Sequence, residues 1–152
     1  MNSYDRLRPF TEIKACQCEE ITGLLLVYIL TDNPIHCIKC KKEIDPERLK
    51  LSPKLVDKIA ECFQVNRSLY QLWLDSGEYE IWAKQKLLAP TSQVNYQGMA
   101  IAKELSDQWP TYYWWFHDEE DDAATVCPNC EEKLDEEVIF EKRKCDQCRV
   151  VV

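Results

Sequence analysis

The stretch that decides the fold is "CPNCEEKLDEEVIFEKRKCDQC", residues 127–148 of a 152-residue chain. It holds two cysteine pairs in the pattern C-x2-C-x14-C-x2-C, namely Cys127, Cys130, Cys145 and Cys148. Each short pair turns two thiolates towards one point, and a hairpin between the pairs brings all four sulfurs together. Because tetrahedral zinc needs four such ligands, the stretch predicts a zinc ribbon whose returning strand is "EVIFEKRK".

A second, looser set of cysteines stands near the N-terminus in the pattern C-x-C-x18-C-x2-C. Its members are Cys16, Cys18, Cys37 and Cys40. The single residue between the first two cysteines is less usual, but it still lets both sulfurs face one metal ion. The apolar run "ITGLLLVYIL", residues 21–30, is a candidate strand of the ribbon hairpin. Two zinc ions are therefore expected, one near each end of the chain.

Other roles for the cysteines and histidines stay open. His36 adjoins Cys37 and is an alternative zinc ligand, although a histidine beside such a turn is more often a surface residue, and His117 lies outside both sets. A C-x-x-C pair at the start of a helix acts as a redox dithiol, but these pairs come in fours and open no clear helix. Cys62 falls on the apolar face of an expected helix, which predicts a buried structural thiol.

The first ten residues, "MNSYDRLRPF", do not favour export, because Asp5, Arg6 and Arg8 stand where an apolar stretch would begin. The cytosol keeps thiols reduced, so nine cysteines favour metal binding over disulfides. The longest apolar run, Gly23 to Leu30, is much shorter than the roughly 20 residues that cross a bilayer. We therefore expect a cytoplasmic protein.

Helical periodicity marks the segment between the two cysteine sets. Ser52 and Pro53 are a favourable start for a helix of about three turns. Asn66 and Ser76 are candidate caps of two further helices, the second of which ends before Pro90, and a fourth helix is expected over residues 95–107. The expected fold class is α+β. Zinc modules at 1–50 and 123–152 brace a middle segment, 51–122, that holds the helices and an aromatic strand.

The segment "WPTYYWWF", residues 109–116, ends in five consecutive aromatic residues. Pro110 breaks the preceding helix, and aromatic residues favour a strand, in which alternate side chains point to opposite faces. One interpretation is a central strand that is covered on both sides. The other is that one face, with Tyr113 and Trp115, is exposed as an anchor for a partner protein.

A run of charged residues, "HDEEDDAA", follows the aromatic segment at residues 117–124. It is either a solvated linker or part of an acidic binding face. On the second interpretation, Tyr113 and Trp115 share the contact with a partner with five acidic residues. These are Asp118, Glu119, Glu120, Asp121 and Asp122.

The net charge of -8 is unevenly placed along the chain. Residues 1–60 hold 10 basic and 9 acidic residues, residues 61–126 hold 4 and 11, and residues 127–152 hold 5 and 7. Four thiolates around one Zn²⁺ leave a charge of -2, so two filled sites would bring the total to about -12. The middle of the chain should therefore repel polyanions and attract cationic proteins.

Four segments, "LWLDSGEYEIWA", "LLAPTSQVNYQG", "PTYYWWF" and "KRKCDQCRVVV", resemble bacterial zinc-ribbon-containing proteins of unknown function, some of them described as nucleic-acid-binding. The resemblance covers roughly residues 65–152 and implies a metal-binding cytosolic protein with zinc on the four C-terminal cysteines. It also permits a role as the immunity partner of a bacterial toxin. In such proteins a glycine commonly follows the second cysteine of a pair. Here Lys41 and Glu131 stand there, so looser turns are expected.

Three classes of function compete. Nucleic-acid binding needs a basic stripe, and the chain offers two small basic clusters, at Lys39–Lys42 and Lys142–Lys144. Catalysis is not expected, because closed four-sulfur sites leave no open metal position and two histidines offer little general-base capacity. The expected function is an acidic, zinc-stabilised protein-binding module, an inhibitor or immunity protein that neutralises a basic partner such as a toxin. The alternative is a zinc-ribbon nucleic-acid-binding protein.

Overall fold

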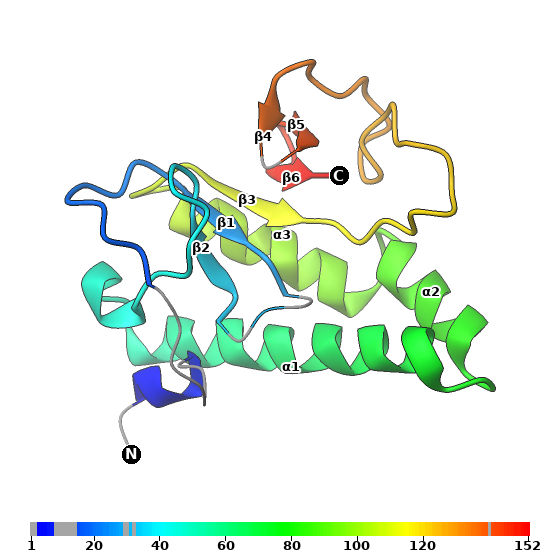
Figure 1. Ribbon diagram of the computed structural model, residues 1–152, viewed down its shortest axis with the longest axis horizontal. Helices are drawn as coiled ribbons and strands as arrows, with labels where there is room; N and C mark the ends of the chain where they lie inside the picture. Colours follow the sequence, from blue (N-terminus) through cyan, green and yellow to red (C-terminus); the bar gives the residue numbers. More distant parts are fainter. Residues whose placement is uncertain (1–2, 8–14, 29–30, 32, 140) are drawn as a thin grey trace.

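Strands from both ends of the chain join one six-stranded sheet, which lies over a layer of helices (Figure 1). The computed structural model describes residues 3–7, 15–28, 31, 33–139 and 141–152. The helices of this part are η1 (Ser3–Leu7), η2 (Pro46–Leu49), α1 (Pro53–Asp75), α2 (Glu80–Leu88) and α3 (Gln93–Leu105). The strands are β1 (Leu24–Leu26), β2 (Ile35–Cys37), β3 (Thr111–Trp114), β4 (Val138–Ile139), β5 (Lys142–Cys145) and β6 (Val150–Val151).

The aromatic segment supplies a central strand of this sheet. The order β2-β1-β3-β6-β5-β4 places β3 between β1 and β6, and it runs parallel to both. The hairpins β1–β2 and β4–β5 are antiparallel. Of the two interpretations of "WPTYYWWF", the central strand is therefore confirmed. The sheet joins strands from all three expected segments, 1–50, 51–122 and 123–152.

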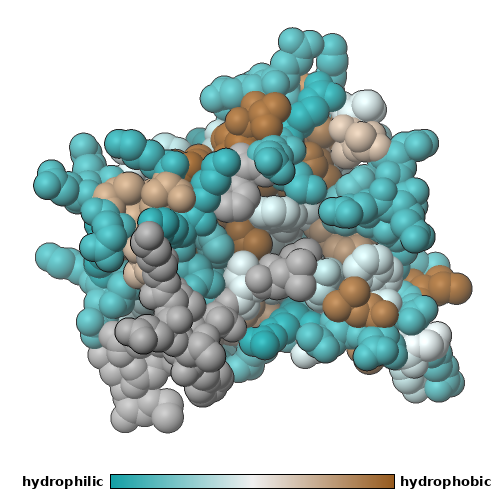
Figure 2. Space-filling model, viewed as in Figure 1, coloured by the Kyte–Doolittle hydropathy of each residue, from teal (hydrophilic) through white to brown (hydrophobic). Residues whose placement is uncertain are grey.

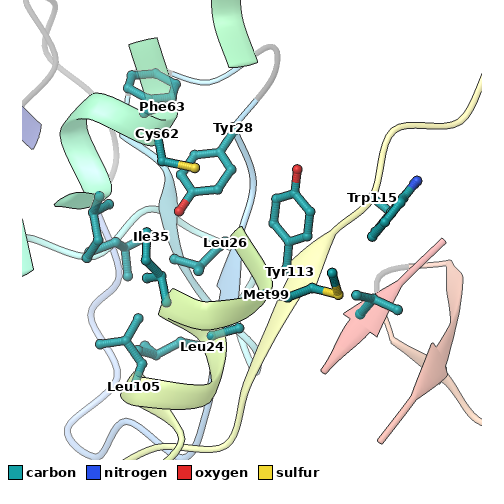
Figure 3. Packing of buried hydrophobic residues seen from close by; sticks show 14 of the residues in the cluster. Leu24, Leu26, Tyr28, Ile35, Cys62, Phe63, Met99, Leu105, Tyr113 and Trp115 are labelled. Atoms are coloured by element: carbon teal, nitrogen blue, oxygen red, sulfur yellow. The ribbon is translucent and has the colours of Figure 1, made fainter. Parts of the chain in front are cut away.

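Alternation along the strands divides their side chains between two faces of the sheet. Leu24, Leu26 and Tyr113 belong to the main core with residues of the helices (Figure 3). In this core the rings of Tyr28 and Tyr113 contact each other with their centroids 5.6 Å apart. The other face carries a smaller apolar cluster, whose buried members are Leu25, Val27, Tyr112 and Val151. Side chains on both faces of β3 are therefore buried.

Helix α1 is longer than the sequence predicts. Ser52 caps it as expected, because its Oγ accepts a hydrogen bond from the backbone N–H of Leu55 at 3.2 Å. The expected second helix is not separate. Asn66, its expected cap, lies inside α1, 3% exposed, and donates from Nδ2 to the Cys62 carbonyl oxygen at 3.3 Å. Apolar residues continue at helical spacing beyond it, so packing carries the helix past a residue of low propensity.

Helices α2 and α3 lie close to their predicted positions, but the expected cap of α2 is corrected. Ser76 is the C-cap of α1, and α2 begins at Glu80 with Tyr79 before it, because the Tyr79 N–H already donates to Ser76 Oγ at 3.1 Å in the turn between the helices. Helix α2 ends two residues before Pro90. Helix α3 begins at Gln93, two residues earlier than expected. The Tyr113 hydroxyl donates to Asn95 Oδ1 at 2.8 Å and thereby ties α3 to β3.

The apolar run from residue 23 to residue 30 contains a short buried strand. β1 covers Leu24–Leu26, and Val27 and Tyr28 are also buried. The prediction of a buried strand is confirmed for this part, whereas residues 29 and 30 lie outside the described residues. None of the described helices combines the length and the apolarity that a membrane crossing requires.

Candidate metal centres and an acidic groove

The structure brings each predicted cysteine set together. The N-terminal cluster consists of Cys16, Cys18, Cys37 and Cys40, and the C-terminal cluster of Cys127, Cys130, Cys145 and Cys148. Within each cluster the four Sγ atoms lie within 4.8 Å of one another, and none is in a disulfide. Four sulfurs at about 2.3 Å from one ion would lie about 3.8 Å apart. The Cys130 and Cys145 Sγ atoms are 3.7 Å apart, so the cluster fits a tetrahedral ion.

The turns at the C-x-x-C pairs are tight. The residue after each pair is left-handed, with φ at 67° for Lys41, 64° for Glu131 and 59° for Arg149. In the first two turns this residue donates its N–H to the first cysteine of the pair, at 2.8 Å to the Cys37 oxygen and 2.9 Å to the Cys127 oxygen. The expectation of looser turns is therefore corrected, because the hydrogen bonds hold a side chain at positive φ.

Hydrogen-bond donors surround the sulfurs of the C-terminal cluster. Asn129 donates its backbone N–H to Cys127 Sγ at 3.4 Å and its Nδ2 to Cys148 Sγ at 3.3 Å. Burial raises the pKa of Cys130, but hydrogen bonds from the Glu132 backbone and the other thiols lower it more. A bound metal ion would act in the same direction. Asn129, which sequence reasoning does not single out, therefore bridges the two cysteine pairs.

The N-terminal cluster has a different support. Its C-x-C segment is too short for the same turn, and Arg48 spans it instead. Nη1 of Arg48 donates to the Cys16 carbonyl oxygen at 2.9 Å, and Nη2 donates to the Cys18 carbonyl oxygen. Burial raises the pKa of Cys16, but the Cys18 backbone and the neighbouring thiols lower it to about 7. Arg48 therefore links the backbone carbonyl groups of the two cysteines in the C-x-C segment.

Each cluster consists of sulfur ligands alone. His36 Nδ1 lies 3.2 Å from the Lys41 carbonyl oxygen, and His36 belongs to neither group of ligand atoms among the described residues. The expectation that His36 is a surface residue is corrected, because it is 8% exposed, and burial lowers its pKa. Cys62 is buried as predicted, and burial raises its pKa to about 12, which keeps this thiol protonated.

The residues expected to contact a partner fall into two groups. Tyr113 and Trp115 are 1% and 0% exposed, so their assignment as partner-binding residues is corrected. Asp118 is 7% exposed and accepts a hydrogen bond from Lys84 at 2.8 Å, which lowers the pKa of the carboxyl group. Asp118 therefore anchors its loop to α2. The exposed acidic residues of the run are Glu119, Glu120, Asp121 and Asp122.

Beside this loop the structure forms a groove of about 640 Å³, which we call the acidic groove. Rings from α1 and β3 line it together with carboxylates from α2 and the loop, mainly Tyr70, Trp73, Trp114, Glu80, Glu119 and Glu120. Trp73 packs edge-on against Phe116, with centroids 4.9 Å apart. Burial and the negative charge of Glu119 raise the pKa of Tyr70. Ordered rings and exposed carboxylates therefore share one hollow.

Basic residues of the C-terminal strands make contacts within the molecule. Lys144 Nζ lies 3.0 Å from Glu137 and 3.2 Å from Asp146. Lys142 Nζ lies 5.3 Å from the centroid of the Trp114 ring, inside the acidic groove. The lysines of the second basic cluster, Lys142 and Lys144, therefore already contact acidic and aromatic residues of the same molecule.

Hydrophilic residues dominate the face drawn in Figure 2, interrupted by apolar patches near the C-terminal strands and α2.

Compared with protein-family models, with curated proteins and with solved structures, the chain matches none of them. Its likeness to zinc-ribbon proteins therefore rests on paired cysteines that the fold gathers into two clusters. Sequence reasoning does not find the acidic groove, because it places a possible partner contact on the face of β3 with Tyr113 and Trp115, whereas Trp114 lines the groove. The alternation of a strand is the available signal, since Trp114 must point away from its neighbours Tyr113 and Trp115.

Proposed function

We propose that this chain is an acidic, zinc-stabilised protein-binding module that neutralises a basic partner, such as a toxin. Each four-cysteine cluster with its hairpin is a zinc ribbon, and the two ribbons brace the sheet from both ends. The exposed acidic surface around the loop after β3 attracts the partner. The module acts by covering the partner's surface and performs no catalysis.

Zinc is the ion that best suits these clusters. Tetrahedral sites of four sulfurs favour zinc or iron–sulfur chemistry, and single-ion sites built on paired C-x-x-C turns are typical of structural zinc. The 3.7 Å separation between Cys130 and Cys145 sulfurs supports a single ion. Four thiolates close the coordination sphere, so the ion would stabilise the fold and present no open position to a substrate.

The observation that carries the proposal is the distribution of exposed charge. Glu119, Glu120 and Asp122 are exposed on one loop, next to partly exposed aromatic rings. By contrast, Lys142 and Lys144 are held by rings and carboxylates of the same molecule. Such an acidic surface attracts a cationic protein, and the rings then anchor it. The same surface repels the phosphate backbone of a nucleic acid.

Purification of the tagged chain from its own cells at low ionic strength tests the proposal. We expect one basic protein to co-purify in a stoichiometric amount and to lose its activity in the complex. Its association rate should fall steeply as salt is added, because exposed charges accelerate the encounter only while they are unscreened. Co-purified nucleic acid in place of a basic protein, or association that salt does not affect, would contradict the proposal.

A further inference from the structure

We infer that the acidic groove receives an arginine or lysine side chain from a basic segment of the partner, and that Lys142 occupies part of this position in the free protein. The inference rests on the proposed function and makes it specific, because it names the site and the chemistry of the contact. Three observations support the inference: the aromatic walls of the groove, its negative charge and the contact between Lys142 and the Trp114 ring.

Aromatic rings form the walls. Tyr70 and Trp73 lie one turn apart on α1, with ring centroids 5.5 Å apart, and Trp114 comes from β3. All three side chains are partly exposed. The face of an aromatic ring attracts a cation within about 6 Å of its centroid, and tryptophan does so most strongly. The groove therefore offers cation-binding faces as well as apolar surface.

Carboxylates stand around these rings. Glu80 lies at the start of α2, and Glu119 and Glu120 lie in the loop after β3. Asp118 also lines the groove, but its charge is balanced by Lys84 at 2.8 Å. A cationic side chain in the groove would thus meet ring faces together with a net negative charge.

Lys142 shows where such a cation lies. It is on β5, lines the groove and places its Nζ 5.3 Å from the centroid of the Trp114 ring. A contact of this kind is worth only about 0.5–1 kcal/mol at an exposed site. An arginine, whose planar guanidinium stacks on indole, can therefore displace it. The resident lysine acts as an internal competitor for the partner's cation.

The size of the groove favours a segment of protein over a single small cation. Its volume is about 640 Å³, which is room for several side chains. Leu74, 50% exposed, lines it beside the rings and offers an apolar contact to residues next to the cation. We therefore assign the groove to a short basic segment that carries apolar neighbours.

The test titrates the zinc-loaded full chain with the acetylated, amidated peptide Gly-Arg-Leu-Arg-Gly and records the indole N–H resonances. The signals of Trp73 and Trp114 should shift and saturate, whereas that of Trp115, which is buried, should stay in place. The same peptide with citrulline for arginine keeps the shape and loses the charge. We expect it to bind about tenfold more weakly, because both the ion pairing and the cation–π contact are lost.

Charge-neutral variants test whether the carboxylates of Glu119 and Glu120 contribute to peptide binding. Glu119→Gln combined with Glu120→Gln should weaken binding of the arginine peptide about fivefold, since exposed ion pairs contribute up to about 1 kcal/mol. Glu132→Gln combined with Glu136→Gln is the matched control. It removes the same charge from exposed side chains outside the groove and should leave the affinity unchanged.

Replacement of Lys142 should strengthen peptide binding, whereas the glutamine variants should weaken it. Lys142→Met should tighten peptide binding about threefold, because it removes the competing cation near the Trp114 ring and a positive charge from the groove. Lys133→Met, an exposed site outside the groove, makes the same change of residue and should have little effect. Weaker binding by Lys142→Met would overturn the inference.

Equal affinities for the arginine and citrulline peptides, or unmoved Trp73 and Trp114 resonances, would overturn the groove assignment. Two further outcomes distinguish a failure of the groove assignment from a failure of the proposed function. If a basic protein co-purifies and binds the groove variants unchanged, the groove assignment fails and the proposed function stands. If the peptide binds as expected and no basic protein co-purifies, the groove assignment is supported and the proposed function fails.

Discussion

Glu131 occupies a position that usually suits glycine. Its φ is 64°, and its N–H donates to the Cys127 oxygen at 2.9 Å to close the turn. A side chain in the left-handed region costs about 1–2 kcal/mol. Glycine costs only about 0.5–1 kcal/mol through the freedom it gains in the unfolded chain. Glu131→Gly should therefore raise the free energy of unfolding by about 0.5–1 kcal/mol in urea denaturation of the zinc-loaded protein.

Glu132→Gly is the matched control for this variant. Glu132 is exposed, carries the same charge and is not among the residues with positive φ. Here glycine relieves no strain, so the free energy of unfolding should fall by about 0.5–1 kcal/mol. A similar loss in both variants would show that the left-handed turn stores no strain at Glu131.

At the scale of the element, helix α3 approaches strand β3 closely at Gly98. A Cβ atom added there would lie 2.5 Å from Cε1 of Tyr113. Tyr113 is 1% exposed and its hydroxyl donates a hydrogen bond to Asn95, so its ring has little room to move. Replacing a helical glycine with alanine gains about 1 kcal/mol of propensity. Overpacking of a core costs about 1–3 kcal/mol, so the clash is the larger effect.

Gly98→Ala should accordingly lower the free energy of unfolding by up to about 2 kcal/mol, measured by urea denaturation. The zinc content should not change, because Gly98 is remote in sequence from both cysteine clusters and contacts β3 instead. A gain in stability would mean that α3 is not pressed against the Tyr113 ring.

Helices are predictable here where local contacts decide their limits. Ser52 and Pro53 begin α1 as expected, since a cap and a proline act within one turn. Asn66 is misleading for a physical reason. Its side-chain amide donates to the Cys62 carbonyl oxygen within α1, and its Oδ1 lies 3.4 Å from the hydroxyl oxygen of Tyr113. Tyr113 is 47 residues away in the sequence, so no local pattern encodes this contact. The union of two expected helices is therefore a tertiary effect.

The cysteine sets are also predictable, because their spacing is itself the chemical requirement. The way the sheet joins the two sets is not. Strand β3 pairs in parallel with β6 in the register Tyr113↔Val150, and parallel pairing leaves no hairpin signature in the sequence. The acidic groove escapes prediction for the same reason, since α1, α2, β3 and the loop after it all contribute to its walls.

At the scale of the whole molecule, the two clusters lie on either side of β3. On one side, Cys37 of the N-terminal cluster pairs with Leu24 of β1. On the other, Cys145 of the C-terminal cluster pairs with Val150 of β6, which in turn pairs with β3. Because metal binding and folding are coupled in such sites, loss of one ion should loosen strands at the centre of the sheet.

Cys145→Ser tests this coupling. The variant should lose the C-terminal zinc ion and melt at a lower temperature than the wild type, and the amide protons of β6 and β3 should exchange faster. Cys62→Ala is the matched control, because Cys62 belongs to neither cluster. It should keep both ions. Faster exchange confined to the residues after 123 would show that the C-terminal ribbon folds independently of the central strand.

Native mass spectrometry of the freshly purified chain tests most directly the central claim, that two closed zinc sites hold the sheet on which the acidic groove is built. We expect the wild type and Cys62→Ala to carry two zinc ions each, and Cys145→Ser to carry one. A wild-type chain without metal, or a mass that shows disulfide bonds in place of zinc, would contradict the claim.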